Sequence, residues 1–98
     1  MSNIVFTWRQ EKNLYNFKEH KIWFEEAKTV FFDDEALLLS DPEHSEEEDR
    51  FLMLGLSAAT RIIIVSHCYR SNDEEIRIIS ARKADREERN QYLQRKRP

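Results

Sequence analysis

Hydrophobic and polar positions along the chain change their spacing several times, and each change marks a predicted element. Residues 4–8 form a short β-branched and aromatic run that is typical of a strand. Residues 10–20 have helical spacing. A second helix is predicted over residues 24–32, because apolar residues recur there at helical intervals, namely Phe24, Ala27, Val30 and Phe31. Its N-cap position falls on Trp23, which is a poor capping residue.

The remainder of the chain is predicted to be mainly strands. Residues 37–39 begin a sheet segment, the acidic residues 43–49 follow as a loop, and further strands are predicted over 50–56, 61–69 and 76–80. Short turns separate these last three strands, which favours antiparallel pairing. A highly charged helix is predicted from residue 84 onward. The order predicts an α+β fold, with an antiparallel sheet of about four to five strands, two N-terminal helices and a C-terminal helix packed on it.

Length and composition limit the domain organisation and the compartment. Ninety-eight residues predict one domain over residues 1–98. The single cysteine, Cys68, excludes a disulfide and a cysteine-based zinc site within one chain. The longest apolar runs, such as residues 62–65, are far shorter than the roughly 20 residues that span a bilayer. No secretory signal is visible, so we expect a cytoplasmic protein that makes no membrane contact.

Charge is distributed unevenly around a formal net charge of −3. Residues 1–60 carry 6 basic and 13 acidic side chains, whereas residues 61–98 carry 10 basic and 6 acidic ones. Nine of the acids lie between residues 33 and 49, where Lys and Arg do not occur. This asymmetry predicts an electrostatic partner for each half of the chain, and the alternative is a solvated surface with local ion pairs.

Histidines and acids do not form a recognisable metal site in the sequence. His20, His44 and His67 are widely spaced, and none belongs to a two-histidine helical motif. The acidic stretch lacks the glycine and the spacing of an EF-hand loop. We therefore expect no metal and no cofactor, and Cys68 is expected to act as a small apolar strand residue.

Basic side chains in the second half of the chain are the more informative candidates. Alternate strand residues share one face, so that His67 and Arg77 would come within reach of each other if their strands pair in register. Arginine forks can hold a scissile phosphate while an imidazole moves a proton, which suits phosphodiester chemistry. The alternative is that each arginine pairs with one of the 19 carboxylates.

Motifs over nearly the whole chain resemble those of the BrnT family of type II toxins. The N-terminal positions are Phe6-x-Trp8, Lys12, Asn16, His20, Phe24-Glu25-Glu26-Ala27, Val30-Phe31 and Asp33. The middle of the chain carries Glu48-x-Arg50 and Gly55. The C-terminal half carries Val65-x-His67-x-x-Arg70, Ile76-Arg77-Ile78-Ile79-Ser80-Ala81-Arg82-x-Ala84 and Glu88-Arg89-x-x-Tyr92. The FEEA and IRIISAR segments, in this order and spacing, are fairly specific together.

The chain departs from the family pattern in three places. Arg9 stands where the family has Asp, and Glu19-His20-Lys21 stands where it has Lys-His-Gly. Trp23 stands at the N-cap position of the second predicted helix, where the family usually has Ser. The changes at Lys21 and Trp23 concern loop geometry, since Gly permits a positive φ and Ser caps a helix.

The resemblance implies a RelE-like fold and a metal-independent endoribonuclease that inhibits translation and growth. It also implies a BrnA-like antitoxin of ribbon-helix-helix type, which would neutralise the toxin by forming a hetero-oligomer with it. The complex would bind operator DNA only indirectly, through the antitoxin. Motif position and chemistry assign phosphate contact to Arg50, Arg77 and Arg82, proton transfer to His67 or His20, and a base or orienting role to Glu48. Further RNA contacts are expected from Lys18, Lys21, Arg70 and Arg86.

Two other functions are compatible with the same residues. A degenerate toxin homologue could serve as a non-enzymatic, antitoxin-binding corepressor subunit. A plain nucleic-acid binder is the third possibility, but the chain has no patch in which aromatic and basic residues interleave.

Overall fold

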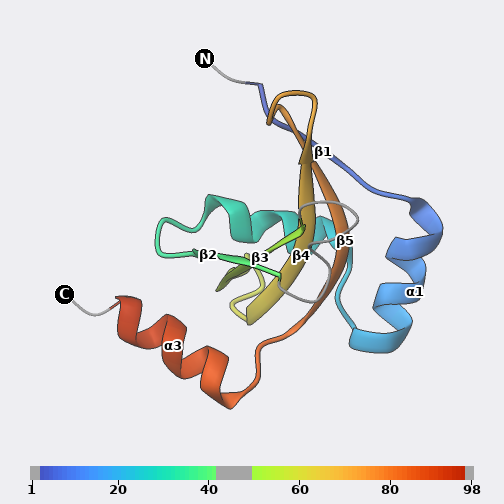
Figure 1. Cartoon of the computed structure of the whole chain (residues 1–98). Coiled ribbons are helices and arrows are strands. Elements are labelled where there is room, and N and C mark those ends of the chain that lie inside the picture. Colours follow the sequence, from blue (N-terminus) through green and yellow to red (C-terminus); the bar gives the residue numbers. More distant parts are fainter. Residues whose placement is uncertain (1–2, 42–49, 97–98) are drawn as a thin grey trace.

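A computed structural model of the chain describes residues 3–41 and 50–96, and five strands of this part form one sheet (Figure 1). The spatial order is β1-β5-β4-β3-β2. The strands are β1 (Val5–Thr7), β2 (Leu37–Ser40), β3 (Arg50–Leu56), β4 (Ile62–Arg70) and β5 (Glu75–Lys83). The α+β class is confirmed, but the sheet is mixed, because β1 pairs parallel with β5 while the other neighbours pair antiparallel. Parallel neighbours need a long connection, and here most of the chain lies between them.

The helical elements are α1 (Gln10–His20), α2 (Phe24–Ala27), the 3-10 helix η1 (Lys28–Phe32) and α3 (Arg86–Lys96). The single helix predicted over residues 24–32 is therefore divided into one α-helical turn and a 3-10 segment. Thr29 and Val30 are β-branched, and the Thr29 hydroxyl donates a hydrogen bond to the backbone oxygen of Glu26 at 2.6 Å. Both features weaken a regular α-helix. Among the described residues, we find no helix whose length and hydrophobicity would let it span a membrane.

The two faces of the sheet are covered by different helices. On one face, which we call the α2 face, the core contains residues of α2, η1, β4 and β5, namely Phe24, Ala27, Val30, Ile63, Val65, Ile76, Ile78 and Ala81, together with Ile22. On the other, the α3 face, Tyr92 and Ala84 pack against Leu54 and Ile64. Figure 1 shows α3 beside one end of the sheet only. The rest of the α3 face therefore lies outside the cover of this helix.

Two buried asparagines attach α1 to the rest of the fold. The Asn16 amide donates to the backbone oxygens of Ile22 and Ala81, both at 2.9 Å, and accepts from the Ala81 N–H at 3.0 Å. Asn16 thereby satisfies both backbone groups of a β5 residue beyond the reach of β1. The Asn13 oxygen accepts the N–H of Phe24 at 2.7 Å, which supplies the helix cap that Trp23 does not provide.

Two further positions, one that departs from the family pattern and one that matches it, have a direct structural interpretation. Lys21 follows α1 with φ 61°, which is the left-handed conformation that a glycine would adopt without strain. A Cβ at Gly55 would lie 2.8 Å from Cγ1 of Val30, so that glycine allows η1 to approach β3. At the same place the Tyr92 hydroxyl donates to Asp33 at 2.6 Å and joins α3 to the residue after η1.

Candidate functional site

A row of polar side chains crosses the α3 face where α3 does not cover it. Arg50 of β3 is paired with Cys68 of β4, and Cys68 is paired with Arg77 of β5. Thr7 of β1 continues the row beyond Arg77. Because residues paired across strands share a face, the register brings Arg50 and Arg77 to the same side of the sheet. Cys68 is 3% exposed between them, consistent with its predicted packing role.

A β-bulge brings Arg82 to the same face as Arg77. These residues are five positions apart, an odd separation that would place them on opposite faces of a regular strand. The register of β5 shifts, however, because His67 pairs with Ile78 whereas Ser66 pairs with Ser80. Ile79 is the additional residue of the bulge, and it shifts the alternation of the residues that follow by one position. Arg82 therefore projects on the same side as Arg77.

Five basic side chains line a small cavity at this part of the sheet. The cavity has a volume of about 180 Å³, and its cationic residues are Arg9, Lys12, Arg50, Arg70 and Arg77. Arg50, Arg70 and Arg77 were predicted by the sequence, whereas Arg9 and Lys12, at the start of α1, were not among the predicted site residues. Both have a signal in the sequence, since Lys12 is a family-like position and Arg9 replaces an Asp of the family pattern. The concentration of positive charge makes this cavity suitable for a phosphate group.

Arg77 has an acidic neighbour, but one of its nitrogen donors makes no hydrogen bond among the described residues. Its Nη2 lies 3.7 Å from Oε2 of Glu75, and that same oxygen accepts a hydrogen bond from the Thr7 hydroxyl at 2.6 Å. Its Nε is buried and has no hydrogen-bond partner among the described residues. A buried donor of this kind is costly unless a ligand or water satisfies it. The buried Nε therefore leaves Arg77 with hydrogen-bonding capacity that its contacts among the described residues do not use.

A second cavity adjoins the first and shares Arg50 with it. Its volume is about 340 Å³, and its lining includes His20 of α1, Ser66, Ser80 and Arg82. Arg82 forms a fork with Glu88 of α3, through Nη1 to Oε1 at 2.9 Å and Nη2 to Oε2 at 3.0 Å. The pair lowers the pKa of Glu88 and raises the pKa of Arg82, so both groups stay charged at neutral pH. The structure thus places Arg50, Arg77, Arg82 and His20 around two cavities that share Arg50.

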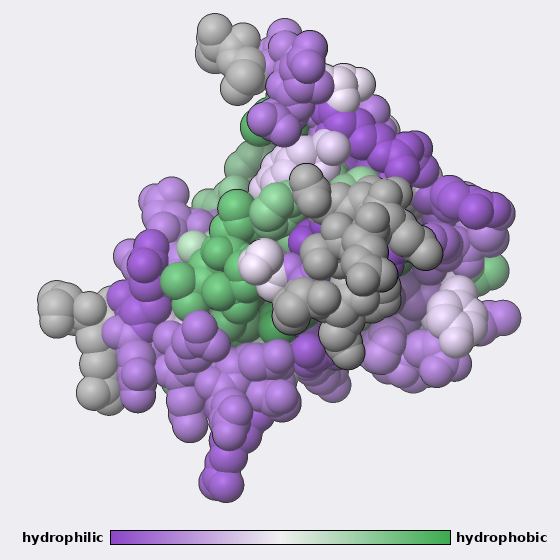
Figure 2. Space-filling view, in the orientation of Figure 1, coloured by the Kyte–Doolittle hydropathy of each residue, from purple (hydrophilic) through white to green (hydrophobic). Residues whose placement is uncertain are grey.

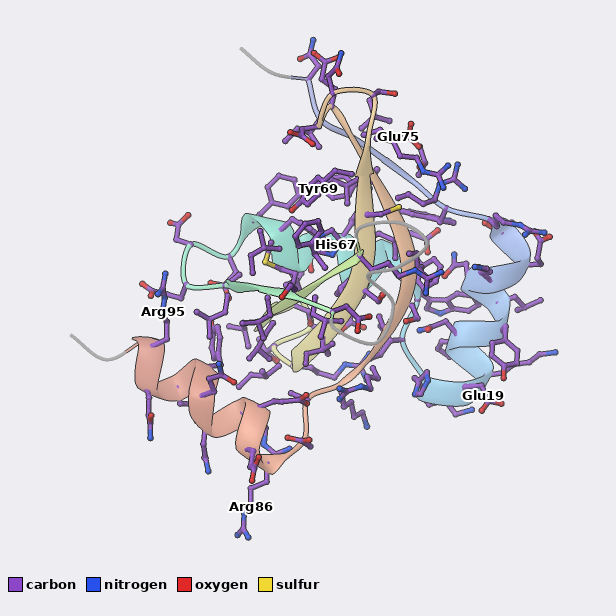
Figure 3. The ribbon with its side chains drawn as sticks, viewed as in Figure 1. Glu19, His67, Tyr69, Glu75, Arg86 and Arg95 are labelled. Atoms are coloured by element: carbon purple, nitrogen blue, oxygen red, sulfur yellow. The ribbon has the colours of Figure 1, made fainter. Side chains whose placement is uncertain are left out.

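His67 does not belong to this cluster, and the prediction that it lies within reach of Arg77 is wrong. It pairs with Ile78, so it projects to the α2 face, where it is 0% exposed and packs edge-on against Phe31 at 4.7 Å. Its Nδ1 is 3.0 Å from the backbone oxygen of Val65, and its Nε2 is 3.2 Å from the Tyr69 hydroxyl. Burial lowers its pKa, which keeps the ring neutral inside the core (Figure 3).

The other predicted RNA contacts lie apart from the two cavities. Lys21 places its ammonium 5.6 Å from the centre of the Phe17 ring, and Lys18 is exposed in the last turn of α1. Arg86 begins α3 and points away from the sheet in Figure 3. Glu48, together with His44 and the acidic loop 43–49, lies outside the described residues.

Arg61 pairs with a carboxylate, which is the alternative role considered for the arginines in the sequence analysis. Its guanidinium forms an ion pair with Glu26 of α2, which also accepts a hydrogen bond from the Ser57 hydroxyl at 2.6 Å. These contacts lower the pKa of the Glu26 carboxyl. Arg61 therefore ties the β3–β4 turn to α2 and takes no part in the basic cavities.

Comparison with known proteins identifies the family of this arrangement. A family model described as "Ribonuclease toxin, BrnT, of type II toxin-antitoxin system" matches residues 8–88. The chain belongs to the BrnT family. The crystal structure of the Brucella abortus ribonuclease toxin BrnT is similar in fold, with a TM-score of 0.64 and 20% identity over 88% of this chain and 100% of that chain. No curated protein sequence matches this chain.

Membership of the BrnT family places the basic cavities in a ribonuclease toxin scaffold of the type II class, whose toxins have an antitoxin partner. The residues that line the two cavities include the family-like positions Lys12, His20, Arg50, Arg77 and Arg82. In the described part of the chain, no group of three or more His, Cys, Asp or Glu side chains could hold a metal ion. The chemistry that these residues offer is therefore anion binding with one nearby imidazole.

Proposed function

We propose that this BrnT-family chain is a cytoplasmic endoribonuclease toxin that binds the RNA backbone across the two cavities of the α3 face and cleaves it without a metal ion. The observation that supports this proposal most directly is the cavity lined by five basic side chains, one of which is Arg77. A phosphodiester supplies the negative charge that such a cluster of guanidinium and ammonium groups binds. The shared position of Arg50 allows consecutive phosphates to occupy the neighbouring cavities.

The proposed reaction is attack of the ribose 2′-hydroxyl oxygen on the adjacent phosphorus. The bond from the 2′-oxygen to phosphorus forms, the bond to the 5′-oxygen of the next nucleotide breaks, and a 2′,3′-cyclic phosphate remains. Arg50 and Arg77 bind the phosphate and stabilise the negative charge that increases during the attack. His20, exposed beside the second cavity, is the imidazole placed to take the proton of the 2′-hydroxyl, and water supplies a proton to the departing 5′-oxygen. His67 is left out of this scheme because its ring lies buried on the opposite face.

Arg77→Ala tests this assignment, with Arg95→Ala as the matched control. Arg95 is an exposed arginine near the end of α3 that lines neither cavity (Figure 3). We expect Arg77→Ala to lower the rate of RNA cleavage by about 100- to 1,000-fold, as is typical when a donor to a charged transition state is lost. The Arg95→Ala protein should cleave at the wild-type rate, and EDTA should leave cleavage unchanged. A folded Arg77→Ala protein with wild-type cleavage would refute the assignment.

We also propose a BrnA-like antitoxin of ribbon-helix-helix type, which would form a hetero-oligomer with this chain and carry the contact with operator DNA. A non-enzymatic corepressor subunit remains the second candidate, because three cavity arginines already have carboxylate partners: Arg82 with Glu88, Arg9 with Glu11 at 2.7 Å, and Arg77 with Glu75 at 3.7 Å. Induced expression separates the two. A toxin arrests growth and its antitoxin restores growth, whereas a corepressor alone leaves growth unaffected.

A further inference from the structure

An apolar groove on the α2 face is separate from the basic cavities. It has a volume of about 550 Å³ and is lined by Ile4, Phe6, Phe31, Phe32, Tyr69 and Ile76. Figure 2 shows hydrophobic residues gathered over η1 and β2 and bordered by hydrophilic ones, and Figure 3 shows Tyr69 near η1. Because Phe6 and Ile76 pair across β1 and β5, the groove lies on the side opposite to Arg77.

Large apolar residues that line the groove are exposed to solvent. The Phe32 side chain is 74% exposed, although its ring centre lies only 6.0 Å from that of Phe6. Ile4 beside it is 48% exposed. Contiguous exposed apolar residues of this kind mark interaction sites, and large aromatic side chains supply much of the energy of protein interfaces.

Acidic residues adjoin the groove and restrict what can occupy it. Exposed Asp34 follows Phe32 by two residues. Burial raises the pKa of the Tyr69 hydroxyl, and the charge of nearby exposed Asp73 raises it further. The backbone oxygen of Glu74 accepts the Val5 N–H at 2.9 Å, which places a third acidic residue beside β1. This negative charge repels RNA and also a second copy of the same groove. It attracts a partner that is both apolar and basic.

We propose that this groove is the docking site for an apolar, basic segment of the antitoxin, an inference that rests on the proposed toxin function. Phe32 would be the anchor that the antitoxin buries, and the acidic residues would pair with lysines or arginines of the same segment. The groove and the RNA cavities lie on opposite faces, so docking and cleavage depend on different residues.

The test measures binding to the protein encoded by the neighbouring open reading frame, purified and immobilised. Phe32→Glu should weaken binding by about 30-fold or more, as expected for an interface anchor. Phe32→Ser should act in the same direction without adding charge. Tyr15→Glu is the matched control, since Tyr15 is an aromatic residue of α1 with 65% exposure outside the groove, and it should bind like the wild type. Asp73→Asn keeps a residue type that tolerates its φ of 69° and should weaken binding mainly at low salt.

Three results would overturn the docking site. They are wild-type affinity in folded Phe32→Glu, absence of a complex between the wild type and that neighbouring protein, and a wild-type homodimer that Phe32→Glu dissociates. Phe32→Glu without antitoxin should cleave RNA at the wild-type rate. Failure of the wild type to cleave RNA would instead count against the proposed function, while the binding comparison would still decide the role of the groove.

Discussion

The Glu88 carboxylate accepts hydrogen bonds from the guanidinium of Arg82, which an RNA phosphate in the second cavity would also have to contact. We predict that Glu88→Gln increases the affinity for RNA, because the amide releases Arg82 from its fork with the carboxylate. The substitution preserves the start of α3. Glu88 and Asp85 accept each other's backbone N–H at 2.8 Å, and glutamine can replace glutamate in such a capping box.

The magnitude follows from the exposure of the pair. The side chains of Arg82 and Glu88 are 44% and 22% exposed, which puts their interaction in the range of surface ion pairs, about 0.2–1 kcal/mol. Removing that competition should lower the Kd for RNA by about 1.5- to 5-fold. Salt screens exposed charges, so the difference should shrink as the ionic strength rises toward 1 M.

The assay is fluorescence anisotropy with a 2′-O-methyl RNA oligonucleotide, which lacks the nucleophile for cleavage. Glu87→Gln is the control, since Glu87 is exposed in the same helical turn and its loss changes the net charge equally. Equal Kd values for Glu88→Gln and Glu87→Gln at low salt, in proteins of equal thermal stability, would refute the competition between Glu88 and RNA for Arg82.

Three further predictions concern stability. Tyr92→Phe should lower the free energy of unfolding by about 2 kcal/mol in urea titrations, because it removes a hydrogen bond to the Asp33 carboxylate; an unchanged midpoint would contradict this. Gly55→Ala should cost about 1–3 kcal/mol through its overlap with Val30, and Val30→Ala should recover part of that loss. The pKa of Glu26 is lowered in the folded state, so its contribution is present above its ordinary pKa of 4.5 and disappears as the pH falls below it. Glu26→Gln should therefore flatten the acid limb of a stability-against-pH curve.

The sequence predicted the elements well because most of them have strong periodic patterns. The strands β3, β4 and β5, the helix α1 and the terminal helix all lie close to their predicted ranges. The parallel pairing of β1 could not be predicted, since it depends on contacts between the first and last strands. The break between α2 and η1 arises from local hydrogen bonding at Thr29, which hydrophobic spacing does not report.

The candidate site was predicted in composition but not in geometry. The arginines at 50, 70, 77 and 82 line the cavities as expected, whereas His67 is buried on the other face. Simple alternation misleads here for a specific reason. His67 pairs with Ile78, not with Arg77, and the extra residue Ile79 reverses the phase of β5 halfway along. Neither the register nor the bulge can be derived from one strand considered alone.

The bulge at Ile79 also determines how this gene can vary in length. Because Ile79 has no partner on β4, loss of its single codon would leave a regular strand in which Ser80 still lies opposite Ser66. Arg77 and Arg82 would then be four residues apart and would still share a face. A deletion library selected for growth arrest should therefore recover variants that lack Ile79.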